Sequence, residues 1–82
     1  MPNQDRSIAQ IRLEDPEDWG LYPKLRVDCR DVQDGETFTA LFPDGWHAIV
    51  IAFDQNKFGP NCWHISTPGF GDLSPIGLFV LV

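Results

Sequence analysis

Hydrophobic and polar residues alternate along much of this chain with a period of two, which is typical of half-buried β-strands. In residues 24–32, for example, Leu25, Val27 and Cys29 share one face between polar neighbours. A short helix competes at the first such stretch, because Ile8 and Ile11 also fit a helical spacing. The pattern predicts six strands, over residues 8–13, 24–32, 37–42, 46–53, 62–67 and 76–82.

Turn residues separate these stretches. Residues 34–35 are Asp-Gly, and residues 43–45 are Pro-Asp-Gly. The second is the clearer turn, because Pro fixes φ, Asp bonds its own backbone and Gly adopts positive φ. Pro16 and Pro23 leave room between them for no more than one short helical turn, which Asp15 would cap.

Two of the predicted strands carry more apolar residues than one buried face requires. Residues 46–53 are apolar on both faces, which predicts the most central strand of the fold or a strand covered on its outer side by a partner. The chain ends in GLFVLV without a charge, and such a strand at an exposed edge would invite aggregation. We expect it to be paired inside a sheet or buried in a subunit interface. A homodimer is a corollary, although a monomer with a central C-terminal strand explains the run nearly as well.

Five to six short strands with tight turns predict a mainly β fold, a small antiparallel barrel or roll. The stretch GETFTALFPDGWHAIVIAF resembles the central hairpin of SH3-like and Tudor-like barrels, in which a strand, an Asp-Gly turn and a Trp-led strand follow one another. The resemblance covers about a quarter of the chain and implies an SH3-like barrel. It carries over no site residues, because the aromatic cage of Tudor domains is not visible. At 82 residues, one domain over residues 1–82 is expected, with residues 1–6 flexible.

Charge narrows the classes of partner. Twelve acidic against six basic residues give a formal net charge of −6, which repels phosphate backbones and anionic membranes. We therefore expect no direct nucleic-acid or membrane binding and allow for a basic protein partner. Residues 1–10 are polar and lack the apolar core of a signal peptide, so the expected location is cytoplasmic. There Cys29 and Cys62 would stay reduced, although a disulfide between them is conceivable if a leader was removed.

The stretch NCWHIS, at residues 61–66, raises the question of chemistry, because Cys62 and His64 lie two residues apart. With Cys29 and His47 they make a Cys2His2 set by count, but the spacing matches no zinc motif. A hairpin that pairs Phe53 with Asn61 would set Ile51 beside Trp63 and Ile49 beside Ile65. It would leave Cys62 and His64 on the opposite face from His47.

We expect no metal, no cofactor and no catalytic residue. A thiol nucleophile needs a base within hydrogen-bond reach and an oriented partner for that base, and the sequence supplies no such third group. The segment PGFGD, at residues 68–72, lacks the lysine and the helix of a phosphate-binding loop.

The expected function is that of a small acidic, non-enzymatic interaction module or accessory protein that self-associates. Trp19 and Tyr22 would anchor a partner beside acidic residues that include Glu17 and Asp18. Trp19 and Tyr22 serve equally well as a hydrophobic lid over one end of the barrel, and solvated loop charge is the simpler interpretation of the acidic residues. Phe70, between two glycines, would be an exposed loop tip that forms a lip with Phe58, and His64 would line a binding face.

The alternative is a small-molecule-binding protein or minor enzyme. Its pocket would be built from Trp46, His47, Cys62, Trp63 and His64.

Overall fold

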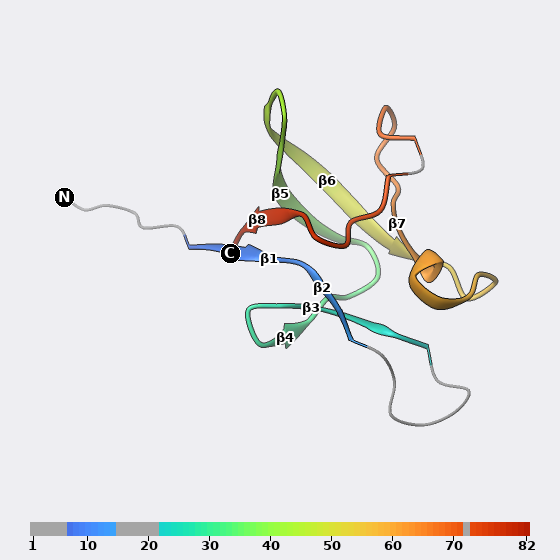
Figure 1. Ribbon diagram of the computed structural model, residues 1–82. Helices are drawn as coiled ribbons and strands as arrows, with labels where there is room; N and C mark the ends of the chain where they lie inside the picture. Colours follow the sequence, from blue (N-terminus) through green and yellow to red (C-terminus); the bar gives the residue numbers. More distant parts are fainter. Residues whose placement is uncertain (1–6, 15–21, 72) are drawn as a thin grey trace.

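The computed structural model describes residues 7–14, 22–71 and 73–82, which form two antiparallel β-sheets (Figure 1). The five-stranded sheet has the order β1-β8-β5-β6-β7, and the three-stranded sheet has the order β2-β3-β4. The strands are β1 (Ile8–Gln10), β2 (Arg12–Glu14), β3 (Lys24–Val27), β4 (Arg30–Asp31), β5 (Glu36–Phe42), β6 (Gly45–Phe53), β7 (Trp63–Ile65) and β8 (Phe79–Leu81).

The hairpin β5–β6 is the longest element and forms as the sequence predicts. Phe42 lies opposite Gly45, so Pro43 and Asp44 make the two-residue connection. Gly45 has a φ of 124°, a conformation that side chains other than glycine rarely adopt. The Pro-Asp-Gly turn thereby fixes the register in which Phe38 and Ile49 face the core.

The second predicted strand, over residues 24–32, is wrong: it is a hairpin. β3 ends at Val27, which lies opposite Arg30 of β4. Asp28 and Cys29 between them both have positive φ, 49° and 71°, which is the conformation of a type I′ turn. The usual sequence signal for this turn is Asn-Gly or Asp-Gly, and Asp-Cys conceals it.

The first predicted strand is divided between the two sheets. β1 pairs with β8 in one sheet, and β2 pairs with β3 in the other. Ile11 at the crossing is fully buried, and its backbone bonds to Leu78 and Gly77. The helical alternative for this stretch is therefore wrong, and the segment joins the two sheets at one side.

The apolar C-terminal stretch is paired inside the sheet, as one of its two expectations had it. β8 lies between β1 and β5, and its Val80 is fully buried opposite Ala40. β6 is an interior strand with two neighbours, but the middle strand of the sheet is β5, so the prediction of β6 as the most central strand is wrong.

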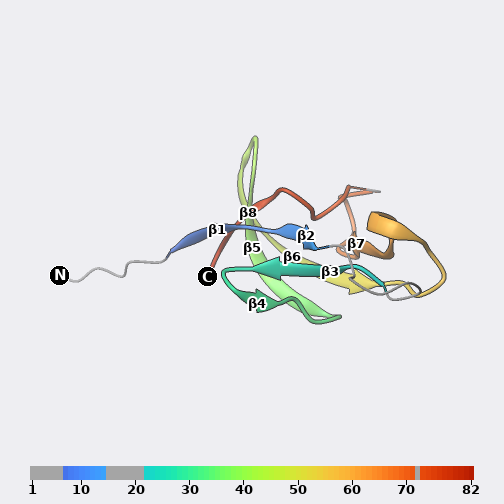
Figure 2. The same cartoon turned by 60° about the horizontal axis from the view of Figure 1, so that its bottom comes forward.

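The hydrophobic core lies between the two sheets (Figure 2). Leu25, Val27 and Val32 come from the side of the three-stranded sheet, and Phe38 and Ile49 are among the residues that oppose them. The described residues form two sheets and no closed barrel, so the SH3-like barrel stays a prediction.

One short 3-10 turn, η1 (Gly59–Cys62), precedes β7. The helical turn expected at Asp15 and Pro16 lies outside the described residues, as do residues 1–6. Among the described residues, none of the helical segments has the length and apolar character needed to cross a bilayer.

Candidate functional site

The five-stranded sheet has an inner face, which contacts the core, and an outer face, which points away from the three-stranded sheet. The alternation of strand side chains assigns each residue to one of them. Ala40, Ile49 and Val80 are fully buried on the inner face. The outer face therefore carries Ile8, Gln10, Thr37, Thr39, Leu41, Trp46, Ala48, Val50, Ala52, His64, Phe79 and Leu81.

Three large side chains form a ridge across the outer face. Leu41 lies directly opposite Trp46, and the pairing of Ala40 with Val80 sets Leu41 beside Phe79. Their exposed fractions are 43%, 41% and 48%. Ile8, at the far edge of the same face, is 57% exposed. Contiguous apolar patches of this kind on small proteins commonly mark interaction sites.

The outer face of the five-stranded sheet bears none of the Asp, Glu, Lys and Arg residues of the described chain. The solvent side of the three-stranded sheet is the opposite case. There Arg26 lies 3.5 Å from Glu14 and 3.7 Å from Asp31, and Lys24 lies 3.8 Å from Asp31. Only one of the two sheets therefore presents water with the charged surface that an exposed sheet face usually carries.

In NCWHIS the structure separates the two residues that raised the question of catalysis. The observed register pairs Phe53 with Trp63 and Ala52 with His64. The predicted pairing, Phe53 with Asn61, is wrong by two residues, and a shift of two leaves every side chain on its expected face. His64 is half-buried on the outer face, while Trp63 is buried on the inner face.

Cys62 belongs to η1, so its predicted place on the strand face of His64 is wrong. It is fully buried, and its thiol donates a hydrogen bond to the carbonyl of Lys57. Burial, with the nearby charge of Asp54 as a smaller cause, raises the pKa of the Cys62 thiol. A buried thiol that stays protonated is a poor nucleophile. Cys29 is exposed at the β3–β4 turn, and both cysteines are free.

Tyr22 and Trp63 hold the segment before β3 against the five-stranded sheet. The Trp63 indole donates a hydrogen bond of 2.9 Å to the carbonyl of Pro23, and the Tyr22 hydroxyl donates one of 2.9 Å to Gln55. Both rings contact Phe53. Tyr22 is still 44% exposed, so its roles as an anchor and as a lid both stay predictions. The other proposed members of the docking strip, Glu17, Asp18 and Trp19, lie outside the described residues.

The prediction of Phe70 as an exposed loop tip is wrong. Phe70 is half-buried and packs against the core, with its ring 4.9 Å from that of Phe42 and 5.9 Å from that of His47. His47 is 2.8 Å from a carboxylate oxygen of Asp44, a hydrogen bond that lowers the pKa of Asp44. Phe58 is exposed as expected, whereas Phe70 is half-buried, so the two rings do not form an exposed lip. Residues of both loops, among them Lys57 and Gly71, nevertheless line one hollow beside β7.

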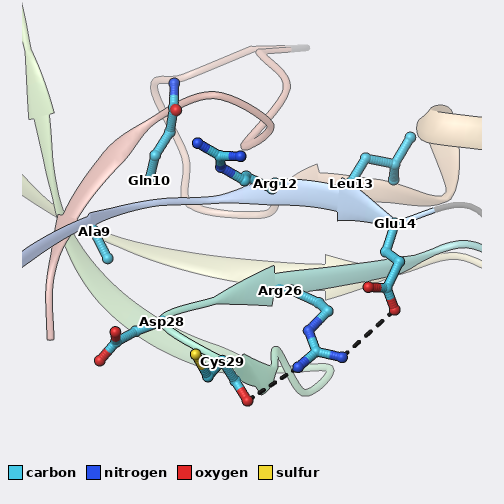
Figure 3. A pocket seen from close by; sticks show the side chains of 8 residues that line it. All are labelled: Ala9, Gln10, Arg12, Leu13, Glu14, Arg26, Asp28 and Cys29. Carbon is cyan, nitrogen blue, oxygen red and sulfur yellow. Dashed lines mark hydrogen bonds and ion pairs between the residues drawn. The ribbon is translucent and has the colours of Figure 1, made fainter.

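The described part of the chain has hollows on its surface, of which two bear on the predicted sites. One, of about 610 Å³, lies between β1, β2 and the β3–β4 turn (Figure 3). Within it Arg26 pairs with Glu14 and donates a hydrogen bond to the carbonyl of Cys29, so its guanidinium is already engaged. The other, of about 410 Å³, lies beside β7 and is lined by residues that include Trp63, His64, Asp54 and Lys57.

The pocket predicted for a small-molecule site is not assembled. Trp46 and His64 are on the outer face, whereas His47 and Trp63 point to the inner side and Cys62 is buried in η1. Only Trp63 and His64 share a hollow. Across residues 7–14, 22–71 and 73–82, no three His, Cys, Asp or Glu side chains are grouped so that they would hold a metal ion.

Ile8, Leu41 and Phe79 were not among the predicted site residues. The excess of apolar residues in 46–53 and in GLFVLV is a sequence signal for Trp46 and Phe79, whereas Ile8 and Leu41 lie outside both stretches. Comparisons with protein-family models, with curated proteins and with solved structures gave no match.

Proposed function

We propose that this protein is a small, acidic, non-enzymatic interaction module that binds a protein partner through the outer face of its five-stranded sheet. One observation carries the proposal: a ridge of large, half-exposed side chains, Phe79, Leu41 and Trp46, crosses a sheet face without charged residues. Neighbouring apolar side chains that are exposed to water favour association, since burial of such surface is the main driving force of protein–protein binding.

The buried Cys62 and the absence of any assembled pocket for the five predicted residues favour binding over catalysis. Both cysteines are free, which fits a reducing, cytoplasmic location. The SH3-like roll belongs to the same proposal. Its support is the strand order, in which the last strand β8 lies between β1 and the β5-β6-β7 meander, as it does in SH3-like barrels.

The basic partner expected from the net charge of −6 remains part of the proposal. Its binding would weaken as salt screens the charges.

A complex in the native host tests this function. A tagged protein is expected to elute from a sizing column, in host extract, well ahead of a 9.3 kDa monomer. Leu41→Lys should shift it to the monomer position. Glu14→Gln, which changes the net charge by the same amount on the three-stranded sheet, should not. Elution of the unchanged protein at the monomer position would contradict the proposal.

A small-molecule site is the second candidate, and the hollow of about 410 Å³ beside β7 favours it. A fragment screen by NMR would show shifts at Trp63 and His64 that His64→Ala removes. A screen without shifts at these residues would eliminate it.

A further inference from the structure

The outer face of the five-stranded sheet places small side chains beside its ridge. Thr39 lies opposite Ala48 on β5 and β6, two residues along each strand from Leu41 and Trp46. Two residues along a strand correspond to about 7 Å. A short row of two small side chains, Thr39 and Ala48, which we call the trough, therefore lies beside Leu41 and Trp46, while Leu81 lies beside Phe79.

A two-fold axis that runs between the ridge and the trough, parallel to both, would bring a second copy into register. It reverses the strand direction, so Leu41 and Trp46 of one copy meet the trough of the other, and Phe79 meets Leu81 of the other copy. Leu41 then opposes Thr39 of the second copy, and Trp46 opposes its Ala48. Side chains of facing sheets interdigitate in this way when large residues meet small ones.

From this self-complementary shape we infer that the occupant of the outer face is a second copy of this chain, bound face to face in a two-fold dimer. The inference rests on the proposed function, since it names the partner of the same surface. A two-fold interface brings one patch against itself, so each residue must tolerate its symmetry mate.

Charge favours the same occupant. On a chain of net charge −6, most surfaces that met themselves would bring carboxylates together. The outer face escapes this repulsion because its described residues include no Asp, Glu, Lys or Arg. The remaining repulsion between two acidic copies is long-range and is screened by salt. The dimer should therefore become tighter as salt increases, the reverse of the behaviour of a basic partner.

The size of the outer face limits how stable the dimer can be. Five strands at about 4.8 Å spacing make the sheet roughly 20 Å wide. The face of a sheet this small makes an interface at the small end of the specific protein–protein interfaces, so we expect a reversible dimer.

Sedimentation equilibrium of the purified 82-residue protein, at micromolar to millimolar concentration, measures this directly. The unchanged protein should show a reversible monomer–dimer equilibrium. Ala48→Trp fills the trough at an exposed position and should weaken the dimer at least about tenfold, as a filled contact does at the centre of an interface. Far-ultraviolet circular dichroism and the melting temperature establish that the variant is folded.

A mixing experiment tests the register of the two copies. Leu41→Lys and Thr39→Glu should each abolish the homodimer, because each sets a charge against an apolar or neutral partner. Mixed in equal amounts they should form a heterodimer, in which Lys at 41 meets Glu at 39 and the second contact keeps Leu41 against Thr39. Glu14→Gln and Arg12→Gln, which make the same changes of net charge on β2, should leave the homodimer unchanged.

Each outcome separates this inference from the proposed function. If the purified protein stays monomeric up to about 1 mM while the complex in host extract persists and is lost with Leu41→Lys, the partner is another protein and the second copy is excluded. If the complex in extract is absent as well, the function fails too. A dimer without rescue on mixing would contradict the proposed register, and a dimer that weakens with salt would contradict an uncharged interface.

Discussion

The two sheets share one core but differ in what their other faces carry. The three-stranded sheet exposes Glu14, Lys24, Arg26 and Asp31, linked by three ion pairs. The five-stranded sheet exposes Leu41, Trp46 and Phe79 instead. Among the described residues, paired charges therefore cover the outer side of the three-stranded sheet, and no charged residue covers the outer face of the five-stranded sheet.

The first prediction separates the inner and outer faces of the five-stranded sheet. Ile49→Ala removes a fully buried side chain and should lower the free energy of unfolding by about 2–5 kcal/mol. Leu41→Ala should lower it by less than about 1 kcal/mol. Urea unfolding, followed by tryptophan fluorescence at about 1 μM so that the chain is monomeric, measures both. Equal losses would show that the outer face stabilises the monomer.

The second prediction places a charged residue, as found on the three-stranded sheet, on the outer face of the five-stranded sheet. Trp46→Glu should raise the dissociation constant of the dimer at least about 30-fold, because loss of a central apolar anchor commonly costs about 2 kcal/mol or more. Lys24→Gln, with the same change in net charge on the three-stranded sheet, should leave it unchanged. Sedimentation equilibrium is the measurement, and equal effects would remove the distinction between the faces.

The third prediction concerns the charged face. Arg26→Ala removes both ion pairs of this residue and its hydrogen bond to Cys29, and should cost about 1 kcal/mol of unfolding free energy, the upper range of exposed pairs. The loss should shrink in 1 M salt. Arg12→Ala is the control, on the same sheet and without a recorded ion pair among the described residues. Urea unfolding of both variants at two salt concentrations measures this loss. A loss of unfolding free energy that is the same at both salt concentrations would show that Arg26 stabilises the fold by packing.

The fourth prediction concerns the link between the sheets. Arg30 of β4 pairs with Glu36 of β5, and this hydrogen bond is the main cause that lowers the pKa of Glu36. Because the pKa is lower in the folded than in the unfolded state, the stabilisation is present above the unfolded value and is lost as pH falls through the folded value. Glu36→Gln should therefore flatten the loss of stability below about pH 5, by less than about 1 kcal/mol. Unfolding measured from pH 7 to 3 tests this, and identical pH profiles would contradict it.

The smallest expected effect lies in the β3–β4 turn. Cys29 adopts positive φ, which disfavours most side chains. Cys29→Gly should relieve this strain and raise the free energy of unfolding by about 0.5 kcal/mol, after the greater freedom of glycine in the unfolded chain is allowed for. Thermal melting with reductant present measures it. A lower melting temperature would mean that the Cys29 side chain contributes contacts beyond its backbone.

The period of two and the turn residues were enough to predict a mainly β fold and the β5–β6 hairpin. They predicted the pairing of the C-terminal stretch inside a sheet as one of two alternatives. The β3–β4 hairpin was not predictable, because Asp-Cys carries no glycine and the alternation continues through the turn. The change of sheet at Ile11 was missed because the alternation of apolar and polar residues continues where the chain passes from one sheet to the other.

The candidate site was visible in part. The apolar excess in residues 46–53 predicted a covering partner as one of two alternatives. Which side chains gather into a ridge depends on the order of the strands, in particular on β8 lying beside β5, and alternation within a strand does not encode its neighbours. His64 was placed on the right face because the register error was two residues, an even number.

The most direct test of the difference between the two outer faces is a dilution series followed by amide NMR from about 1 mM to 10 μM. We predict concentration-dependent shifts at residues of the outer face, above all Leu41, Trp46 and Phe79, and none at Lys24, Arg26 or Asp31. Spectra that do not change with concentration, or shifts centred on the three-stranded sheet, would contradict the account.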